Sequence, residues 1–253
     1  TFKWNMGWMH DFLEYMKLDP YFRKFNHGKM TFSLMYAYSE NFILVLSHDE
    51  VVHLKCSMLG KMPGDREDKF ANLKLAYAYM CGHPGKKLLF MGQEFGQWNE
   101  WSEKRALDWY LLEDDSHKEL KDFTKACLIL NKKYRCLYET DYSPEGFRWI
   151  NANDKDNSVF SFIRISPDKK RHLLFVFNFT PVERPNHRIG VPVKGKYKLV
   201  LGDDMKNQKK TLTSVRGECD GYKESLLIDL HRYGIAVYEF NGDVNAHKPT
   251  KIS

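Results

Sequence analysis

The sequence has few cysteines and no long apolar run. Its five cysteines, in 253 residues, are widely spaced and include no C-x-x-C pair, so neither a disulfide framework nor a zinc knuckle is expected. No stretch approaches the ~20 apolar residues that a membrane span needs, and the first residues lack the pattern of a signal peptide. These absences predict reduced thiols, no membrane partner and a cytoplasmic location.

The chain also lacks a concentrated block of basic charge. Its formal net charge is +6, but the lysine pairs are scattered along the sequence. Proteins that bind nucleic acid through electrostatics usually gather such residues in one run or on one face. We therefore expect no nucleic-acid partner.

What is present is a large apolar fraction with two kinds of pattern. Apolar residues make up 43% of the chain, enough for a sizeable core. Two short apolar runs, 41–47 and 86–95, flank an amphipathic stretch at 66–81, which predicts parallel strands joined by a helix in a right-handed crossover. Further helices are predicted at 11–18, 31–40 and 116–134.

From about residue 140 the pattern becomes one of short β-type runs separated by turn residues. The runs are FRWI, SVFSFIRI, LLFVFNF, YKLVL, SLLIDL and IAVYEF. This spacing predicts an antiparallel all-β module. The chain therefore divides, on the sequence alone, into an α/β part at 1–139, an all-β part at 140–242 and a solvated tail at 243–253.

The apolar run 42–46 ends in His48, Asp49 and Glu50, with His53 close behind. This grouping superficially resembles the zinc motif H-E-x-x-H, but the two histidines are five residues apart. At ~100° per helical residue they would lie ~140° apart around a helix. We therefore predict no metal site.

An active-site edge fits these residues better. The carboxyl ends of parallel strands line the mouth of α/β sheets and barrels, where polar residues tend to be functional. His48 and Asp49 follow one predicted strand and Glu94 follows the next. A capping role for Glu94 at the next helix is the alternative, whereas the histidine beside Asp49 favours hydroxyl binding.

Tryptophans gather around the same segments. Trp4 and Trp8 lie near the start, and Trp98, Trp101 and Trp109 follow the second strand. Flat aromatic faces stack on the C–H faces of sugars. The alternative is that these rings only fill the interior.

A series of motifs then resembles a known family. They are KWNMGWMHD (3–11), LSHDEVVH (46–53), LGKMPGD (59–65), KFANL (69–73), HPGKKLLFMGQEFGQ (83–97), LDWYLLE (107–113), SPEGFRWI (143–150) and NFTPV (178–182). In this order, over at least residues 3–190, they resemble the bacterial glycogen branching enzymes of glycoside hydrolase family 13. The resemblance implies the C-terminal part of a (β/α)8 barrel followed by an antiparallel β-sandwich.

The resemblance also implies an activity and roles for several residues. Family members cut an α-1,4 glucan, hold it as a covalent glycosyl-enzyme and transfer it to a 6-hydroxyl, without metal or organic cofactor. At the family's SHDE motif, Asp49 matches the carboxylate that stabilises the transition state, and His48 matches the histidine that binds glucose hydroxyls. Glu50, Trp4, Trp8 and Glu94 are further candidates for binding an α-glucan such as glycogen.

Two kinds of departure from the family matter. The family's nucleophile and acid/base precede KWNMGW, so this chain would hold about three barrel strands and be inactive without the N-terminal half of the enzyme, its expected partner. The family usually has proline at Val45, glycine at Leu54 and lysine or glycine near Cys56. The loop after the motif is therefore expected to approach substrate differently.

Two other interpretations stay open. The chain could be a non-catalytic glucan-binding module in which the sandwich and exposed tryptophans hold polysaccharide. Related hydrolases such as the α-amylases share the His-Asp pair but lack KWNMGW and GKMPGD.

Overall fold

The computed structural model describes residues 1–168 and 170–245, and its contacts separate two units. Unit 1 is Thr1–Ile129 and unit 2 is Leu130–Ser253. The boundary at 139 and the division into 1–139, 140–242 and 243–253 stay predictions. Most of the expected tail, 246–253, lies outside the described residues.

Unit 1 is built on a three-stranded parallel sheet in the order β1-β2-β3. The strands are β1 (Lys3–Trp4), β2 (Phe42–Leu46) and β3 (Lys86–Leu89). The last three residues of β2 are at most 1% exposed, as expected of a strand covered on both faces. The parallel pairing of β2 with β3, predicted from the two apolar runs, is confirmed.

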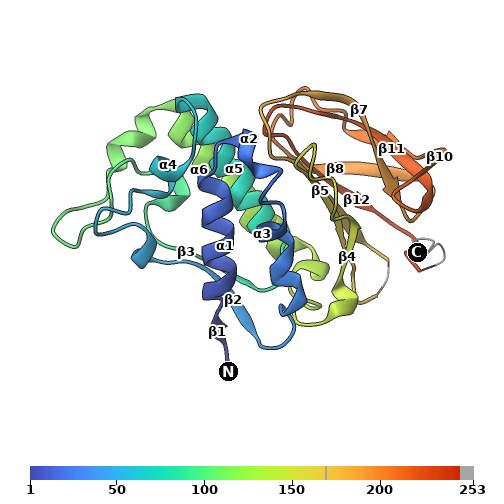
Figure 1. Cartoon of the computed structure of the whole chain (residues 1–253), viewed down its shortest axis with the longest axis horizontal. Helices are drawn as coiled ribbons and strands as arrows, with labels where there is room; N and C mark the ends of the chain where they lie inside the picture. The colour runs from blue at the N-terminus through green and yellow to red at the C-terminus, as the bar shows by residue number, and fades with distance from the viewer. Residues whose placement is uncertain (169, 246–253) are drawn as a thin grey trace. The chain divides into compact units, whose positions relative to one another are not determined.

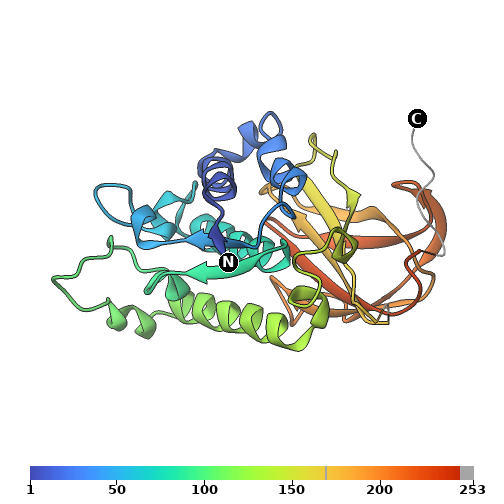
Figure 2. The ribbon, with the colours of Figure 1, turned by 90° about the horizontal axis from the view of Figure 1, so that it is seen from below.

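Three long helices accompany this sheet: α1 (Met6–Lys17), α5 (Arg66–Gly82) and α6 (Asp115–Lys133). Figure 2 shows α1 on one side of β2 and β3 and α6 on the other. Shorter elements in unit 1 are α2 (Pro20–Arg23), α3 (Gly28–Thr31), α4 (Met58–Lys61), η1 (Phe32–Met35), η2 (His48–Glu50), η3 (Gln93–Phe95) and η4 (Trp109–Glu113). No helix in the described ranges 1–168 and 170–245 is long and apolar enough to cross a membrane.

Helix α5 connects β2 to β3, and the sequence fixes both of its ends. The Asp65 side chain caps its N-terminus by accepting a hydrogen bond from the Asp68 amide at 2.9 Å. The helix stops at Gly82 because His83 precedes a proline and takes an extended conformation. This helix confirms the one predicted at 66–81.

The helix predicted at 31–40 is wrong. Its residues form the end of α3 and the single 3₁₀ turn η1, followed by turns and bends. η1 has no side-chain cap at its N-terminus, and the Ser39 hydroxyl donates to the Tyr36 carbonyl at 2.8 Å. Such local bonds compete with helix formation.

Unit 2 contains two antiparallel sheets, ordered β4-β5-β6-β12-β8-β9 and β10-β11-β7. In Figure 1 they form two layers. The bounds are η5 (Arg135–Leu137), η6 (Pro144–Gly146), β4 (Phe147–Asn151), β5 (Val159–Arg164), β6 (His172–Asn178), β7 (Arg184–Val191), β8 (Lys196–Gly202), β9 (Thr211–Thr213), β10 (Val215–Cys219), β11 (Tyr222–Leu230) and β12 (Ile235–Phe240). The predicted all-β module is therefore confirmed as an antiparallel sandwich.

The core of unit 2 is formed by inward-facing residues of both sheets. Leu174 and Val176 of β6 meet Leu226 and Ile228 of β11 in one buried cluster. Alternate residues of each strand point inward, as in other sandwiches. Val244 is fully buried in the same cluster, although it belongs to the segment expected to be a solvated tail.

Candidate functional site

The carboxyl ends of β2 and β3 lie at the same edge of the parallel sheet, because Leu46 is in register with Leu89. Two hydrogen bonds join the end of β2 to the segment that follows β3. The Phe90 amide and the Gln93 side-chain amide both donate to the Leu46 carbonyl, each at 3.1 Å. The chain leaving β2 and the chain leaving β3 are therefore held side by side where the sequence predicted a functional edge.

His48 and Asp49 occupy this edge within η2, directly after β2. About half of each side chain is exposed, and His48 Nε2 lies 3.2 Å from Asp49 Oδ1. The buried Ser47 hydroxyl donates to the other carboxylate oxygen, Oδ2, at 3.3 Å. The His48 ring also lies 5.7 Å, centroid to centroid, from the Phe90 ring. An oriented carboxylate and an imidazole thus face solvent together, a set able to bind hydroxyl groups.

Glu50 behaves differently from its two neighbours. Only 8% of it is exposed, and the ammonium of Lys55 lies 3.6 Å from its Oε1 atom. We call residues 51–56 the 51–56 loop. The Glu50 carboxylate is turned toward it. This placement gives Glu50 a role in supporting that loop.

Glu94 lies in η3, after β3, but its surroundings belong to the helices. The Thr124 hydroxyl of α6 donates to its carbonyl at 3.2 Å. Burial and the negative charge of Glu94 together raise the pKa of the Tyr77 hydroxyl in α5. In the described part of the chain no hydrogen bond joins Glu94 to His48 or Asp49.

The tryptophans separate into exposed and buried rings. Trp4 is 47% exposed, Trp98 38% and Trp109 52%. Trp8, however, is 2% exposed, and its ring stacks on Phe12 with centroids 4.6 Å apart. The expectation that Trp8 binds substrate is corrected here, because its helical position in α1 directs the ring into the core, where it has no free face for a sugar.

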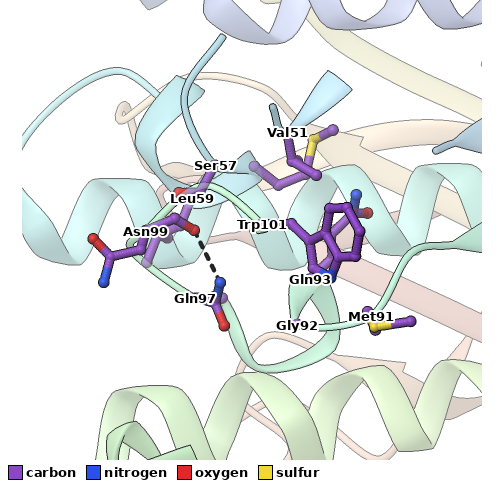
Figure 3. A pocket seen from close by; sticks show the side chains of 11 residues that line it. Val51, Ser57, Leu59, Met91, Gly92, Gln93, Gln97, Asn99 and Trp101 are labelled. Atoms are coloured by element: carbon purple, nitrogen blue, oxygen red, sulfur yellow. Dashed lines mark hydrogen bonds between the residues drawn. The ribbon is translucent and has the colours of Figure 1, made fainter. Parts of the chain in front are cut away.

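A hollow of about 240 Å³, a volume that includes open solvent, lies beside Trp101, after β3 (Figure 3). The Gln97 side chain donates to the Asn99 carbonyl at 3.1 Å across one part of its wall. Its lining comes from the 51–56 loop, α4 and the segment after β3: Val51, Ser57, Met58, Leu59, Met91, Gly92, Gln93, Gly96, Gln97, Asn99 and Trp101. The wall thus combines thioethers and an indole with several amides.

Sequence reasoning missed one residue at this edge, Glu100. Its carboxylate accepts hydrogen bonds from the backbone amides of Leu54 at 3.1 Å and Cys56 at 2.7 Å. These partners lie more than 40 residues away in the sequence, so no spacing pattern could have indicated the contact. The family's usual glycine at Leu54 was the one available signal, because it points to unusual backbone geometry there.

Comparison with known families gives a consistent picture. Residues 149–241 match the family described as "Alpha amylase, C-terminal all-beta domain". The chain is similar to solved structures of AmyP in complex with maltose (11% identity, TM-score 0.62, 94% of this chain and 49% of that one) and of an α-amylase from H. orenii (15%, TM-score 0.57, 94% and 48%). At these identities the likeness concerns the fold.

The sequence relatives are much closer. The 1,4-alpha-glucan branching enzyme GlgB of Butyrivibrio fibrisolvens is 53% identical over 247 residues, which are 95% of this chain and 39% of the relative. The proteins of the same name from Bacillus cereus (strain AH187) and Aquifex aeolicus are 47% and 52% identical, over 94% and 81% of this chain and 38% and 32% of their own lengths. The chain spans about a third to two fifths of the length of these curated relatives. By this similarity it belongs to the 1,4-α-glucan branching enzymes of glycoside hydrolase family 13 and corresponds to their C-terminal portion.

Proposed function

We propose that this chain is part of a glucan transferase that cuts α-1,4 linkages and forms α-1,6 branches in glycogen. The observation that carries the proposal is the pair of exposed side chains, His48 and Asp49, at the end of β2. The substrate would be an α-glucan, the reaction would need no cofactor, and the protein would act in the cytoplasm.

In this proposal Asp49 stabilises the transition state. Sugar hydroxyls become more acidic as positive charge develops on the ring, so a carboxylate that accepts their hydrogen bonds binds the transition state more tightly than the ground state. The hydrogen bond from Ser47 holds one carboxylate oxygen and leaves the exposed half of the group to the substrate. His48, beside it, would bind glucose hydroxyls, and Trp4 and Glu94 are secondary candidates for substrate binding. Glu50, expected from the sequence to bind substrate, would instead support the 51–56 loop.

We further propose that unit 1 is the C-terminal part of a (β/α)8 barrel. A closed barrel has no edges, whereas β1 here is an edge strand of two exposed residues. Unit 1 also exposes large apolar side chains that a longer barrel would cover: Phe2, Met6, Tyr21, Phe22, Phe25, Phe32 and Met35. The partner would be the N-terminal half of the enzyme, and the 253-residue chain alone would be inactive, since retaining chemistry needs a nucleophile and an acid/base.

The replacement Asp49→Asn in the complete enzyme tests the catalytic role. We expect kcat to fall about 100-fold or more while KM for glucan changes little, because the interaction lost is one made mainly in the transition state. Asp122→Asn is the matched control, since Asp122 is exposed on α6. Equal losses in glucan binding and turnover would instead give Asp49 a structural role, and new α-1,6 linkages formed by the 253-residue chain alone would refute its predicted inactivity.

A second function, non-catalytic glucan binding, is favoured by the exposed rings of Trp98 and Trp109. Aromatic faces at a surface suit polysaccharide binding. Affinity electrophoresis of the 253-residue chain in glycogen gels separates the two functions. Strong retardation that is lost in Trp109→Ala would favour the binding module, while unhindered migration would favour the catalytic part.

A further inference from the structure

The 51–56 loop, directly after the His48–Glu50 turn, has an unusual backbone. His53, Leu54 and Cys56 have φ angles of 56°, 64° and 64°, in the left-handed region. Side chains other than glycine are disfavoured there because Cβ approaches the following carbonyl. Three such residues within four positions persist only where surrounding contacts hold them. The loop therefore needs an anchor outside its own sequence.

Glu100 supplies that anchor. Its Oε2 accepts from the Leu54 amide at 3.1 Å, and its Oε1 accepts from the Cys56 amide at 2.7 Å. Both amides belong to left-handed residues, so one carboxylate spans the strained part of the loop. Hydrogen bonds to an ionised acceptor are roughly twice as strong as those between neutral groups.

The segment that carries Glu100 is itself fixed to the same loop. The Trp101 amide donates to the Val51 carbonyl at 2.9 Å, immediately beside the carboxylate contacts. Arg105 Nη2 donates to the Glu100 carbonyl at 2.6 Å. These two hydrogen bonds therefore fix the backbone of the segment that carries the Glu100 carboxylate.

Lys55 connects the 51–56 loop to Asp49. Lys55 lies in the sequence between Leu54 and Cys56, whose amides Glu100 holds. Its ammonium donates to the Asp49 carbonyl at 2.8 Å and lies 3.6 Å from Glu50 Oε1. The Lys61 ammonium of α4 in turn donates to the Lys55 carbonyl. Displacing the loop would withdraw Lys55 and release the backbone of the turn that presents Asp49.

We propose that Glu100 is a positioning residue that holds the 51–56 loop in its left-handed conformation and, through Lys55, fixes the turn carrying Asp49. Its effect on turnover rests on the proposed function. Its hold on the loop does not, because it concerns only contacts within this chain.

Amide hydrogen exchange on the 253-residue chain, followed by NMR, tests the hold on the loop. Glu100→Ala removes both acceptors, and we expect exchange at Leu54 and Cys56 to become at least about tenfold faster. Glu100→Gln keeps a single carbonyl oxygen, so it should release one amide and retain the other. Glu103→Gln, an exposed neighbour, is the control and should change neither amide. Unchanged exchange in Glu100→Ala would overturn the proposal.

Kinetics of the complete enzyme test the effect on Asp49. Per folded enzyme, we expect kcat to fall at least about tenfold in Glu100→Ala and less in Glu100→Gln, with KM for glucan nearly unchanged, because geometry rather than binding is lost. Unaltered kcat despite fast loop exchange would overturn the positioning role. Absence of branching in the parent enzyme would refute the proposed function instead, and the exchange result would still decide whether Glu100 holds the loop.

Discussion

Replacing Leu54 by glycine should stabilise the chain, although the change deletes a whole side chain. Leu54 is 96% exposed, so its removal sacrifices almost no packing. Its φ of 64° is one that glycine adopts freely, and glycine is also what the family resemblance implies at this position. The effect of the substitution is therefore decided by backbone conformation.

Its magnitude follows from two opposing terms. Relief of the left-handed conformation is worth about 1–2 kcal/mol. Glycine lowers the free energy of unfolding by about 0.5–1 kcal/mol, because the unfolded chain gains conformational freedom. The difference is a net stabilisation of about 0–1.5 kcal/mol, with a central value of about 0.8 kcal/mol.

Urea denaturation of the 253-residue chain measures this difference as a rise in midpoint at constant m-value. Leu128→Gly is the matched control, because Leu128 is 56% exposed but lies within helix α6, where glycine costs about 1 kcal/mol. The two substitutions should shift the midpoint in opposite directions. A lower midpoint for Leu54→Gly would refute the argument that the loop is strained.

Two further predictions concern buried charges. In unit 2, Arg164 Nη2 lies 3.0 Å from Asp141 Oδ1 with both side chains at most 1% exposed; Asp141→Ala should lower the free energy of unfolding by about 3–5 kcal/mol, read from urea midpoints, because it removes the carboxylate that lies against a buried guanidinium. A loss below about 1 kcal/mol, typical of exposed pairs, would contradict this. Burial, followed by repulsion from Lys17, lowers the pKa of Lys61 from its ordinary 10.5 to about 8. Between these two values the unfolded chain binds more protons than the folded chain, so the stability conferred by Lys61 rises with pH. The free energy of unfolding of the parent, relative to Lys61→Met, should be constant below about pH 8 and rise toward pH 10.5. Urea midpoints across this range measure the difference, and a constant difference would contradict the lowered pKa.

Much of the fold was predictable because its signals are local. Helix α5 has a cap, a repeating apolar face and a Gly-Pro stop, and six strands of unit 2 have apolar runs bounded by turn residues. Strand β7 (Arg184–Val191) was missed because RPNHRIGV contains a proline and only two apolar residues at its end. Its place in the sheet depends on pairing with β11, far along the chain.

The candidate site was predictable to a lesser extent. The strand-end rule correctly located His48 and Asp49 at the edge shared by β2 and β3. It could not tell which aromatic rings face outward, so Trp8 was misjudged: its spacing within α1 suits the core as well as a surface. Glu100 escaped because a carboxylate that binds distant backbone amides leaves no periodic pattern in sequence.

Cys56 makes the 51–56 loop chemically addressable. It is exposed, whereas Cys81, Cys127 and Cys136 are buried. The hydrogen bond with Cys81, followed by burial, raises the pKa of Cys127 well above its usual value, and burial raises the pKa of Cys219 to about 11. Because the thiolate is the reactive form, a maleimide dye at neutral pH should attach selectively at Cys56. The native sequence thus supplies a single fluorescent handle seven residues from Asp49, through which the loop could be compared between the parent chain and Glu100→Ala without introducing a new cysteine.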